Sequence, residues 1–401
     1  MKVLQINKFL YPKGGAETYM FQLSTALKEH GIEVDFWGMQ DDKNTIKDTY
    51  KSFSKHVNYQ HTGFLNNLSN AQKTIYSVES RKNISLILDQ FQPDLVHLHN
   101  YNFQLTPSIL PEISKRGIKI VQTIHDSQMI CPYHRLYNFQ KDTICTKCVT
   151  GSFFNCISDK CFDGSFLKSI IGASESYFYH SMGYYEKYID QFISPSSFLA
   201  DLVKKRIKNK VIDVIPNFSE KIEDLKSHQD NYYLYFGRIS GEKGILELVD
   251  IFKDLKFDLF IIGKGDQEEE LKKKIENIKN ISFLGSKSEK ELFSYVEGAK
   301  YVMQPSKWYE NCPMTVIESF TYGTPVIASD HSGFKDLIEH EKTGYLLDFN
   351  NLEDIKKSIV EIDNENVDLM KQNIEIFYQE NLKKETHISK IIEIYNQLLQ
   401  K

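Results

Sequence analysis

Two carboxylates bracket a predicted helix start in the second half of the sequence. Glu310 and Glu318 lie on either side of Pro313, a residue suited to the first turn of a helix. The N–H groups of Met314 and Thr315 begin that helix and, with the helix dipole, form a site suited to phosphate. The carboxylate pair could act as general acid and base, or could accept hydrogen bonds from sugar or ribose hydroxyls. By spacing alone, both could also be ordinary surface charges.

The residues around this pair predict a strand, a loop, a helix and a second strand. Tyr301 to Met303 is a short apolar run, which indicates a buried strand. Apolar residues recur at helical spacing from Met314 to Tyr322, and Gly323 ends that helix. The run from Pro325 to Ala328 then begins another strand.

Two glycine-rich turns upstream carry cations. A strand predicted at 232–236 is followed by Arg238 and Lys243, each beside a glycine. Two cations in a loop at a strand end can neutralise a diphosphate, since Arg offers a planar fork and Lys a point charge. By chance alone such a pair would be surface charge. Lys264 occupies a second turn of this kind, Gly-x-Gly, and is a weaker candidate for the same role.

The first half opens with the same arrangement. A strand at 2–7 leads into Gly14 and Gly15, and a helix follows, as at the start of a Rossmann-like unit. Adjacent glycines let the backbone approach a diphosphate or sugar closely, although a simple tight turn would also use them.

Histidines stand at the ends of two further predicted strands. The strand at 118–124 is followed by His125. The strand that begins at Pro93 carries His97 and His99 on one face, and we interpret both as structural. His99 lies at the carboxyl end of its strand, where α/β folds bind ligands.

In combination these motifs resemble a known family. Glu-x7-Glu, preceded by Pro-Ser and followed by Gly-x-Pro-Val-Ile-Ala, resembles the nucleotide-sugar site of the retaining glycosyltransferases of family 4. The resemblance implies that Glu310 lies near the donor sugar and that Glu318 holds the ribose. Asn311 stands where the family usually has glycine after the first glutamate, and Asn tolerates left-handed backbone better than most residues.

The resemblance extends to the other glycine-rich turns. Arg238 and Lys243 resemble the pair that binds the leaving pyrophosphate. The Gly-Gly-Ala-Glu turn at Gly14 and Gly15 resembles the N-terminal loop that meets the donor phosphates and sugar. His125 matches a histidine that lies against the donor sugar and contributes by hydrogen bonding.

The family implies an α/β GT-B fold, with two Rossmann-like doubly wound domains facing a central cleft. We expect an acceptor-side domain at 1–218 with a cysteine-rich insertion at about 131–164, a nucleotide-sugar domain at 219–380, and a helix at 381–401 that crosses back to the first domain. Closure of the domains would exclude water from the reaction.

The activity that the resemblance implies is transfer of a sugar from a nucleotide-diphosphate donor, with retention of configuration. UDP is expected on family frequency, with GDP as the alternative. The acceptor would be a glycan or a lipid-linked glycan in the synthesis of a bacterial capsule or other surface polysaccharide. No catalytic metal is expected, because Arg238, Lys243 and the helix N-terminus can stabilise the leaving diphosphate and the sequence has no Asp-x-Asp motif. The rival hypotheses are a GT-B nucleotide-sugar epimerase and a non-catalytic, zinc-bearing scaffold.

Five of the six cysteines lie between residues 131 and 161. A Cys-x2-Cys pair followed by two more cysteines fits a structural zinc site with four thiolate ligands. The predicted ligands are Cys145, Cys148, Cys156 and Cys161, and Cys131 could replace one of them. Unpaired thiols and redox disulfides are the alternatives.

Composition limits the class of protein. The chain has 401 residues, 41% of them hydrophobic and 26% charged, which is typical of a globular protein of two or three domains. A net charge of -5 argues against a nucleic-acid binder. The start of the sequence reads as a strand and not as a signal peptide, so we expect a cytoplasmic protein. Aromatic residues at 166–188, predicted as one long helix, and a basic run at 204–210 suggest peripheral contact with the inner face of the plasma membrane.

Overall fold

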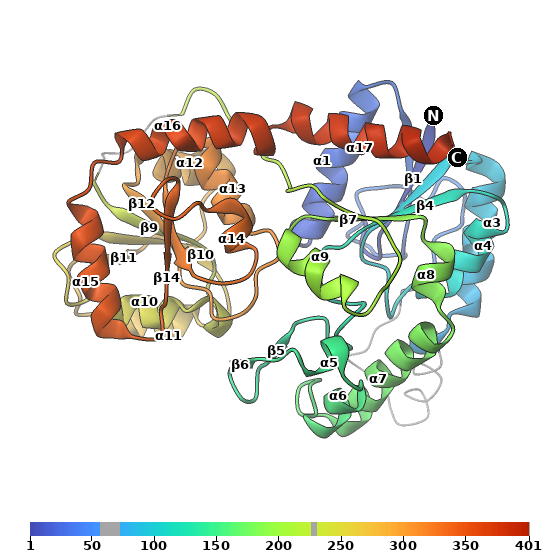
Figure 1. Ribbon diagram of the computed structural model, residues 1–401, viewed down its shortest axis with the longest axis horizontal. Coiled ribbons are helices and arrows are strands. Elements are labelled where there is room, and N and C mark those ends of the chain that lie inside the picture. The colour runs from blue at the N-terminus through green and yellow to red at the C-terminus, as the bar shows by residue number, and fades with distance from the viewer. Residues whose placement is uncertain (57–72, 226–230, 401) are drawn as a thin grey trace. The chain divides into compact units, whose positions relative to one another are not determined.

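The computed structural model describes residues 1–56, 73–225 and 231–400 (Figure 1). The chain divides into two compact units. The first comprises Met1–Lys141, Cys145–Ile215 and Ile388–Lys401, and the second comprises Asp142–Ile144 and Pro216–His387.

Each unit is built on a six-stranded sheet whose paired strands are parallel. The first sheet has the order β2-β1-β3-β4-β7-β8, with the bounds β1 Lys2–Ile6, β2 Glu33–Trp37, β3 Leu95–Leu98, β4 Lys119–Thr123, β7 Gln191–Ser194 and β8 Ile212–Val214. The second has the order β11-β10-β9-β12-β13-β14, with the bounds β9 Tyr233–Arg238, β10 Leu259–Lys264, β11 Ile281–Phe283, β12 Tyr301–Gln304, β13 Val326–Ser329 and β14 Gly344–Leu347. These strands read as continuous apolar runs because both faces of a parallel sheet are covered.

Helices connect the strands within each unit. Those of the first unit are α1 Gly15–Glu29, α3 Val78–Phe91, α4 Leu110–Ser114, α5 Lys147–Thr150, α6 Phe154–Ser158, α7 Phe166–Ser181, α8 Tyr184–Tyr188 and α9 Ser197–Lys204. Those of the second are α10 Ile245–Phe252, α11 Glu268–Ile275, α12 Glu289–Gly298, α13 Met314–Thr321, α14 Phe334–Leu337, α15 Leu352–Asp363 and α16 Asp368–Phe377. The last helix, α17, spans Lys384–Leu399.

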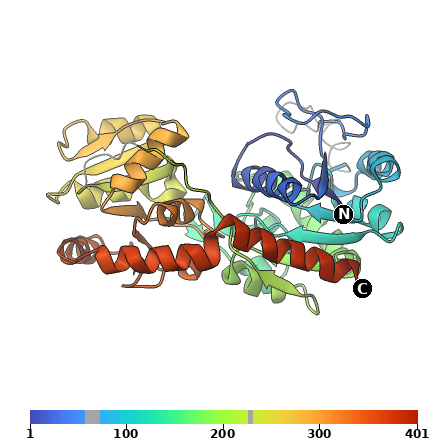
Figure 2. The same ribbon diagram turned by 90° about the horizontal axis from the view of Figure 1, so that it is seen from above.

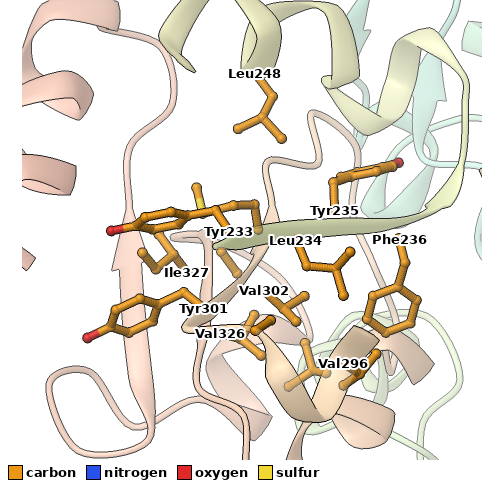
Figure 3. Packing of buried hydrophobic residues seen from close by; sticks show 14 of the residues in the cluster. Tyr233, Leu234, Tyr235, Phe236, Leu248, Val296, Tyr301, Val302, Val326 and Ile327 are labelled. Carbon is orange, nitrogen blue, oxygen red and sulfur yellow. The ribbon is translucent and has the colours of Figure 1, made fainter. Parts of the chain in front are cut away.

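Figure 1 shows α10 and α11 on one side of the second sheet and α12 and α13 on the other. The core follows the same division. Along β9, Tyr233 and Tyr235 lie on the side of the strand that faces Leu248 of α10, while Leu234 and Phe236 lie on the side of Val296 of α12 (Figure 3). Alternation along a strand therefore supplies both apolar layers.

In each sheet, the strands that follow the first one in the chain lie on both sides of it, so the order in which strands are added reverses at that first strand. In the first unit β1 lies between β2 and β3, and in the second β9 lies between β10 and β12. Open α/β sheets bind ligands at the carboxyl ends of the strands at such a reversal. The residues that follow β1, β3, β9 and β12 are therefore the ones that the fold places best for binding.

The segment at 166–188 forms two helices, so the prediction of one long helix is wrong. Gly183, with φ +61°, adopts the left-handed conformation between α7 and α8 and interrupts the helical ladder. The aromatic residues there divide between the two environments, since Tyr179 and Tyr185 are buried whereas Phe166 and Tyr177 are exposed.

The sequence from Ser69 to Gln90 has helical periodicity with many polar residues, which indicates a peripheral helix or a pair of helices, and α3 forms in this region. Residues 69–72 lie outside the described part of the chain. Helix α16 was not predicted from the sequence. Within the described ranges, no helix has the length and apolar character that crossing a bilayer requires.

Candidate functional site

Two cations lie at the strand reversal of the second unit. Arg238 is the last residue of β9, and Lys243 lies in the short 3-10 turn that follows it. The Arg238 side chain is 55% exposed and donates to Glu242 at 3.3 Å. The indole ring of Trp308 lies 6.0 Å from the Arg238 guanidinium carbon and 5.4 Å from Lys243 Nζ. Arg238 thus presents its charge to solvent, where an anion can reach it.

Lys243 and Glu310 form an ion pair that is largely shielded from water. Lys243 Nζ lies 2.5 Å from Glu310 Oε1, and the two side chains are only 18% and 13% exposed. The same carboxylate oxygen accepts hydrogen bonds from Ser306 Oγ at 2.8 Å and Trp308 Nε1 at 2.7 Å. Burial would raise the pKa of Glu310, but Lys243 and these hydrogen bonds hold it below its usual value. The carboxylate is therefore ionised and fixed in orientation.

The loop that carries Glu310 is anchored to the segment after β13. The Glu310 N–H donates to Ser332 Oγ at 3.1 Å, and the Gly333 N–H donates to the Glu310 carbonyl at 2.9 Å. A Cβ at Gly333 would lie 1.6 Å from the Asn311 carbonyl oxygen. Only glycine allows this close approach, so Gly333 sets the path of the loop at Asn311.

Helix α13 begins directly after this loop. Its first intrahelical hydrogen bonds run from the N–H groups of Val316 and Ile317 to the Pro313 carbonyl. The N–H groups of Met314 and Thr315 lie before these hydrogen bonds, at the N-terminal end of the helix. Glu318 lies one turn further along, where burial raises its pKa to about 8. At neutral pH this carboxyl is protonated, and hydroxyl donors such as a ribose diol would favour its ionised form.

Lys264 ends β10 and lies opposite Arg238 in the register of the two strands. Its side chain is exposed. The second unit therefore brings together Arg238, Lys243 and Glu310, with Lys264 on the adjacent strand end.

The predicted residues of the first unit lie at the carboxyl edge of the other sheet. His125 follows β4, and its Nε2 lies 2.9 Å from Nδ1 of His99, which follows β3. His99 Nε2 lies 2.7 Å from Gln5 Oε1. Since the amide oxygen accepts, His99 carries its proton on Nε2, and its Nδ1 accepts from the Nε2–H of His125. Burial lowers the pKa of His99 and lowers that of His125 to about 3, so both rings are neutral.

The interpretation of His97 and His99 as structural is consistent with their surroundings. Both are fully buried, and their rings stack with centroids 4.5 Å apart. His97 Nε2 lies 2.7 Å from Thr123 Oγ1, and Tyr395 of α17 lies 2.6 Å from His97 Nδ1. His99 also contacts His125. The sequence does not predict this contact, because the two histidines follow different strands.

Gly14 and Gly15 begin α1. An added Cβ at Gly15 would meet no atom within 4 Å, and one at Gly14 would meet only Glu17 Oε2 at 3.6 Å. Neither glycine is required by packing within the chain, which leaves their backbone accessible to a ligand. Glu17 is buried and accepts from Asn7 Nδ2 at 3.1 Å, which ties the first turn of α1 to the end of β1.

Sequence reasoning missed several residues that the structure adds to these sites. In the first unit, burial lowers the pKa of Lys8 and raises that of Asp126, and the two groups attract one another. In the second, Trp308 orients Glu310 together with Ser306 of the Pro-Ser motif, whose hydrogen bond to this carboxylate the sequence did not predict. Trp308 is one of only two tryptophans and lies in a polar loop, which is the signal that could have identified it.

All six cysteines are free thiols, and the five between residues 131 and 161 line one pocket of the first unit. Across the described ranges, no three or more His, Cys, Asp or Glu side chains are already arranged to hold a metal ion. The predicted zinc ligands Cys145, Cys148, Cys156 and Cys161, and Cys131 as the possible replacement for one of them, all lie in this pocket, and which four would bind zinc stays a prediction.

Comparison with known sequences identifies relatives among the glycosyltransferases. Residues 13–219, more than half of the chain, match the family model described as Glycosyltransferase Family 4, and residues 217–379 match Glycosyl transferases group 1. An uncharacterized glycosyltransferase of Methanocaldococcus jannaschii is 31% identical over 182 residues, which cover 44% of this chain and 50% of that protein. The lipopolysaccharide 1,2-N-acetylglucosaminetransferase of Salmonella typhimurium is 28% identical over 184 residues, or 39% of this chain and 48% of that one. The chain thus spans about half the length of these curated relatives.

Solved structures share the fold over nearly the whole chain. Sucrose-phosphate synthase of Thermosynechococcus elongatus superposes with a TM-score of 0.71 at 17% identity, over 100% of this chain and 99% of that one. Anabaena HepE in complex with UDP superposes with a TM-score of 0.65 at 16% identity, over 99% and 100%. With two parallel six-stranded sheets and these matches, the chain belongs to glycosyltransferase family 4 and has the GT-B fold.

Proposed function

We propose that this protein is a retaining glycosyltransferase that moves a sugar from a nucleotide-diphosphate sugar to a glycan or lipid-linked glycan acceptor. The observation that carries the proposal is the arrangement of Arg238, Lys243 and Glu310 at the strand reversal of the second sheet. Arg238 is exposed to an incoming anion, and Lys243 is held rigidly by Glu310.

In the proposed reaction, the bond between the anomeric carbon and the diphosphate oxygen breaks, and its electron pair leaves with the diphosphate. Arg238, Lys243 and the first N–H groups of α13 stabilise the charge that develops there. The acceptor hydroxyl forms the new bond on the same face of the sugar, and its proton passes to a departing phosphate oxygen.

The remaining predicted residues orient the donor. Glu318 accepts hydrogen bonds from the ribose hydroxyls, and Glu310 lies near the sugar. Gly14, Gly15 and the neutral His125 meet the phosphates and the sugar. UDP is the proposed nucleotide, supported by the UDP complex of Anabaena HepE. The Salmonella relative supports a role in surface polysaccharide synthesis.

Donor binding tests the proposal first. UDP, GDP and their sugar conjugates are added to the full chain, and the one that binds should raise the melting temperature. Arg238→Ala, Lys243→Ala and Glu318→Ala should each reduce this shift. Lys272→Ala, which removes an exposed cation of α11 paired with Glu268 and Glu269, should leave it unchanged. Equal shifts in all four variants would contradict the site.

Turnover is then measured with the identified donor and a panel of glycan acceptors. Loss of one cation should reduce transfer by about 100- to 1000-fold, as for other groups that stabilise transition-state charge. Anomeric NMR signals of the product should show retained configuration. Inversion would refute the retaining mechanism, and an isomerised sugar formed without acceptor would establish an epimerase instead. No binding of any nucleotide would favour a non-catalytic scaffold.

A further inference from the structure

The segment between β4 and α7 concentrates thiols that the proposed transferase reaction does not use. Its five cysteines, Cys131, Cys145, Cys148, Cys156 and Cys161, line one pocket, although up to 30 residues separate them along the chain. The remaining cysteine, Cys312, belongs to the loop before α13 in the second unit.

Four of the five thiols are close enough for every pair to interact electrostatically. All six pairwise combinations occur among Cys131, Cys148, Cys156 and Cys161. Cys148 and Cys156 are buried, and the Cys156 and Cys161 thiols hydrogen-bond to each other. Cys145 interacts with Cys148 within the Cys-x2-Cys pair.

Backbone donors point at two of these sulfur atoms. Main-chain N–H groups of Tyr133, Arg135 and Leu136 are directed at the Cys131 thiol, and the Cys156 N–H is directed at Cys148. The turn after Cys131 thus surrounds this sulfur and keeps it in the same pocket as the other four cysteines, although Cys131 lies outside the Cys-x2-Cys pair.

The surrounding segment has little apolar core to hold it. Its hydrophobic cluster contains four buried residues, Cys148, Phe153, Cys156 and Ala173, and two of these are the cysteines themselves. Small loop-rich segments of this kind commonly depend on a bound metal or on disulfides for their structure. Arg206 adds one polar anchor, since its guanidinium donates to the Gly151 carbonyl at 2.5 Å and lies 4.1 Å from the Phe153 ring.

We propose that Cys131, Cys148, Cys156 and Cys161 bind one structural Zn²⁺ as a tetrahedral site of four thiolates. Four soft sulfur ligands select zinc over harder divalent cations such as Mg²⁺. Among the described residues the side chains are not already in ligand positions. Each cysteine has a single side-chain rotor, so binding requires the four sulfurs to turn from the pocket wall toward a common point at about 2.3 Å from the ion. The ion would join residues 131–161 into one closed loop.

Metal content of the full chain tests the proposal independently of transferase activity. Protein produced with added zinc should contain one zinc per chain by mass spectrometry, and six thiols should titrate after denaturation and chelation. Cys131→Ser, Cys148→Ser, Cys156→Ser and Cys161→Ser should each lose the zinc. Cys145→Ser and Cys312→Ser, the matched controls, should retain it.

Three results would overturn this assignment: wild-type protein without zinc, a Cys156–Cys161 disulfide in the purified protein, or zinc lost from Cys145→Ser and retained in Cys131→Ser. Because some serine variants could fail to fold, the wild-type protein is also refolded with Co²⁺. Thiolate-to-cobalt charge-transfer absorption with intense tetrahedral visible bands supports the site, whereas the weak bands of octahedral cobalt refute it.

Discussion

Glu318 shows how one partly buried carboxyl couples stability to pH. Its pKa is about 8 in the folded protein and 4.5 in the unfolded chain, so the folded state keeps a proton that the unfolded state releases between these values. The stability that this group contributes is complete below about pH 4.5 and is lost as the pH rises toward 8.

We therefore expect Glu318→Gln to be more stable than the wild type at pH 8, with a smaller difference near pH 5. Urea denaturation at both pH values measures this difference. Glu361→Gln, at an exposed position of α15, should show no such pH-dependent gain. Parallel pH profiles for wild type and Glu318→Gln would contradict the raised pKa.

Substitutions in the Lys243–Glu310 ion pair can distinguish its contribution to stability from its contribution to sugar transfer. Lys243→Met removes one partner of a shielded ion pair and should cost about 3–5 kcal/mol, because Glu310 is left buried and uncompensated. The double variant Lys243→Met/Glu310→Gln should recover most of that free energy of unfolding in urea while transfer stays impaired. Recovery of transfer in the double variant would show that the pair serves only stability.

At the scale of elements, glycines set how closely the loops of the site approach one another. Gly244, between the 3-10 turn and α10, has φ +69°, and a Cβ there would lie 2.1 Å from the Pro305 carbonyl oxygen at the end of β12. This contact joins the turn that carries Lys243 to the loop that carries Glu310.

Gly244→Ala should therefore destabilise the protein by more than the cost of left-handed backbone, which is about 1–2 kcal/mol. It should also weaken nucleotide binding, because Pro305 must move. Gly323→Ala is the matched control, since Gly323 has φ +73° but nothing within 4 Å of an added Cβ. Thermal unfolding with and without nucleotide compares the two, and equal losses would show that the Pro305 contact is unimportant.

At the scale of the molecule, the last helix completes the first unit. Residues from Ile388 onward group with the first unit, and α17 runs along that unit's sheet in Figure 2. Its Tyr395 is fully buried and lies 2.6 Å from His97 Nδ1, although 298 residues separate the two in the chain. The C-terminal segment is thus part of the packing beneath His99 and His125.

Tyr395→Ala should cost about 3–5 kcal/mol, as for other large buried aromatic residues, and should reduce transfer by disturbing the histidine stack. Asn396→Ala, at the adjacent exposed position, should change neither property. Urea denaturation and turnover measure both. A stable Tyr395→Ala variant with full activity would show that α17 does not support the site.

Much of the fold could be predicted from local patterns. Short apolar runs, such as those at 118–124 and 301–303, indicated strands of both sheets, because each parallel strand is buried on both faces. Arg238, Lys243, Glu310 and Glu318 were identified by the resemblance of their motifs to the family, because by spacing alone each could be an ordinary surface charge. The structure then shows that Arg238 and Lys243 follow a strand end and that Glu310 and Glu318 lie on either side of a helix start.

Tertiary structure decided which of these residues meet and how they are held. Lys243 and Glu310 are 67 positions apart, and His99 and His125 are 26 apart, so neither contact follows from the spacing within one motif. Cys131 lines the same pocket as the four later cysteines, which the folding of the segment after β4 brings close to it. Such contacts, and the burial that shifts the pKa of Glu318 and His125, depend on how distant elements pack, and no single stretch of sequence contains that information.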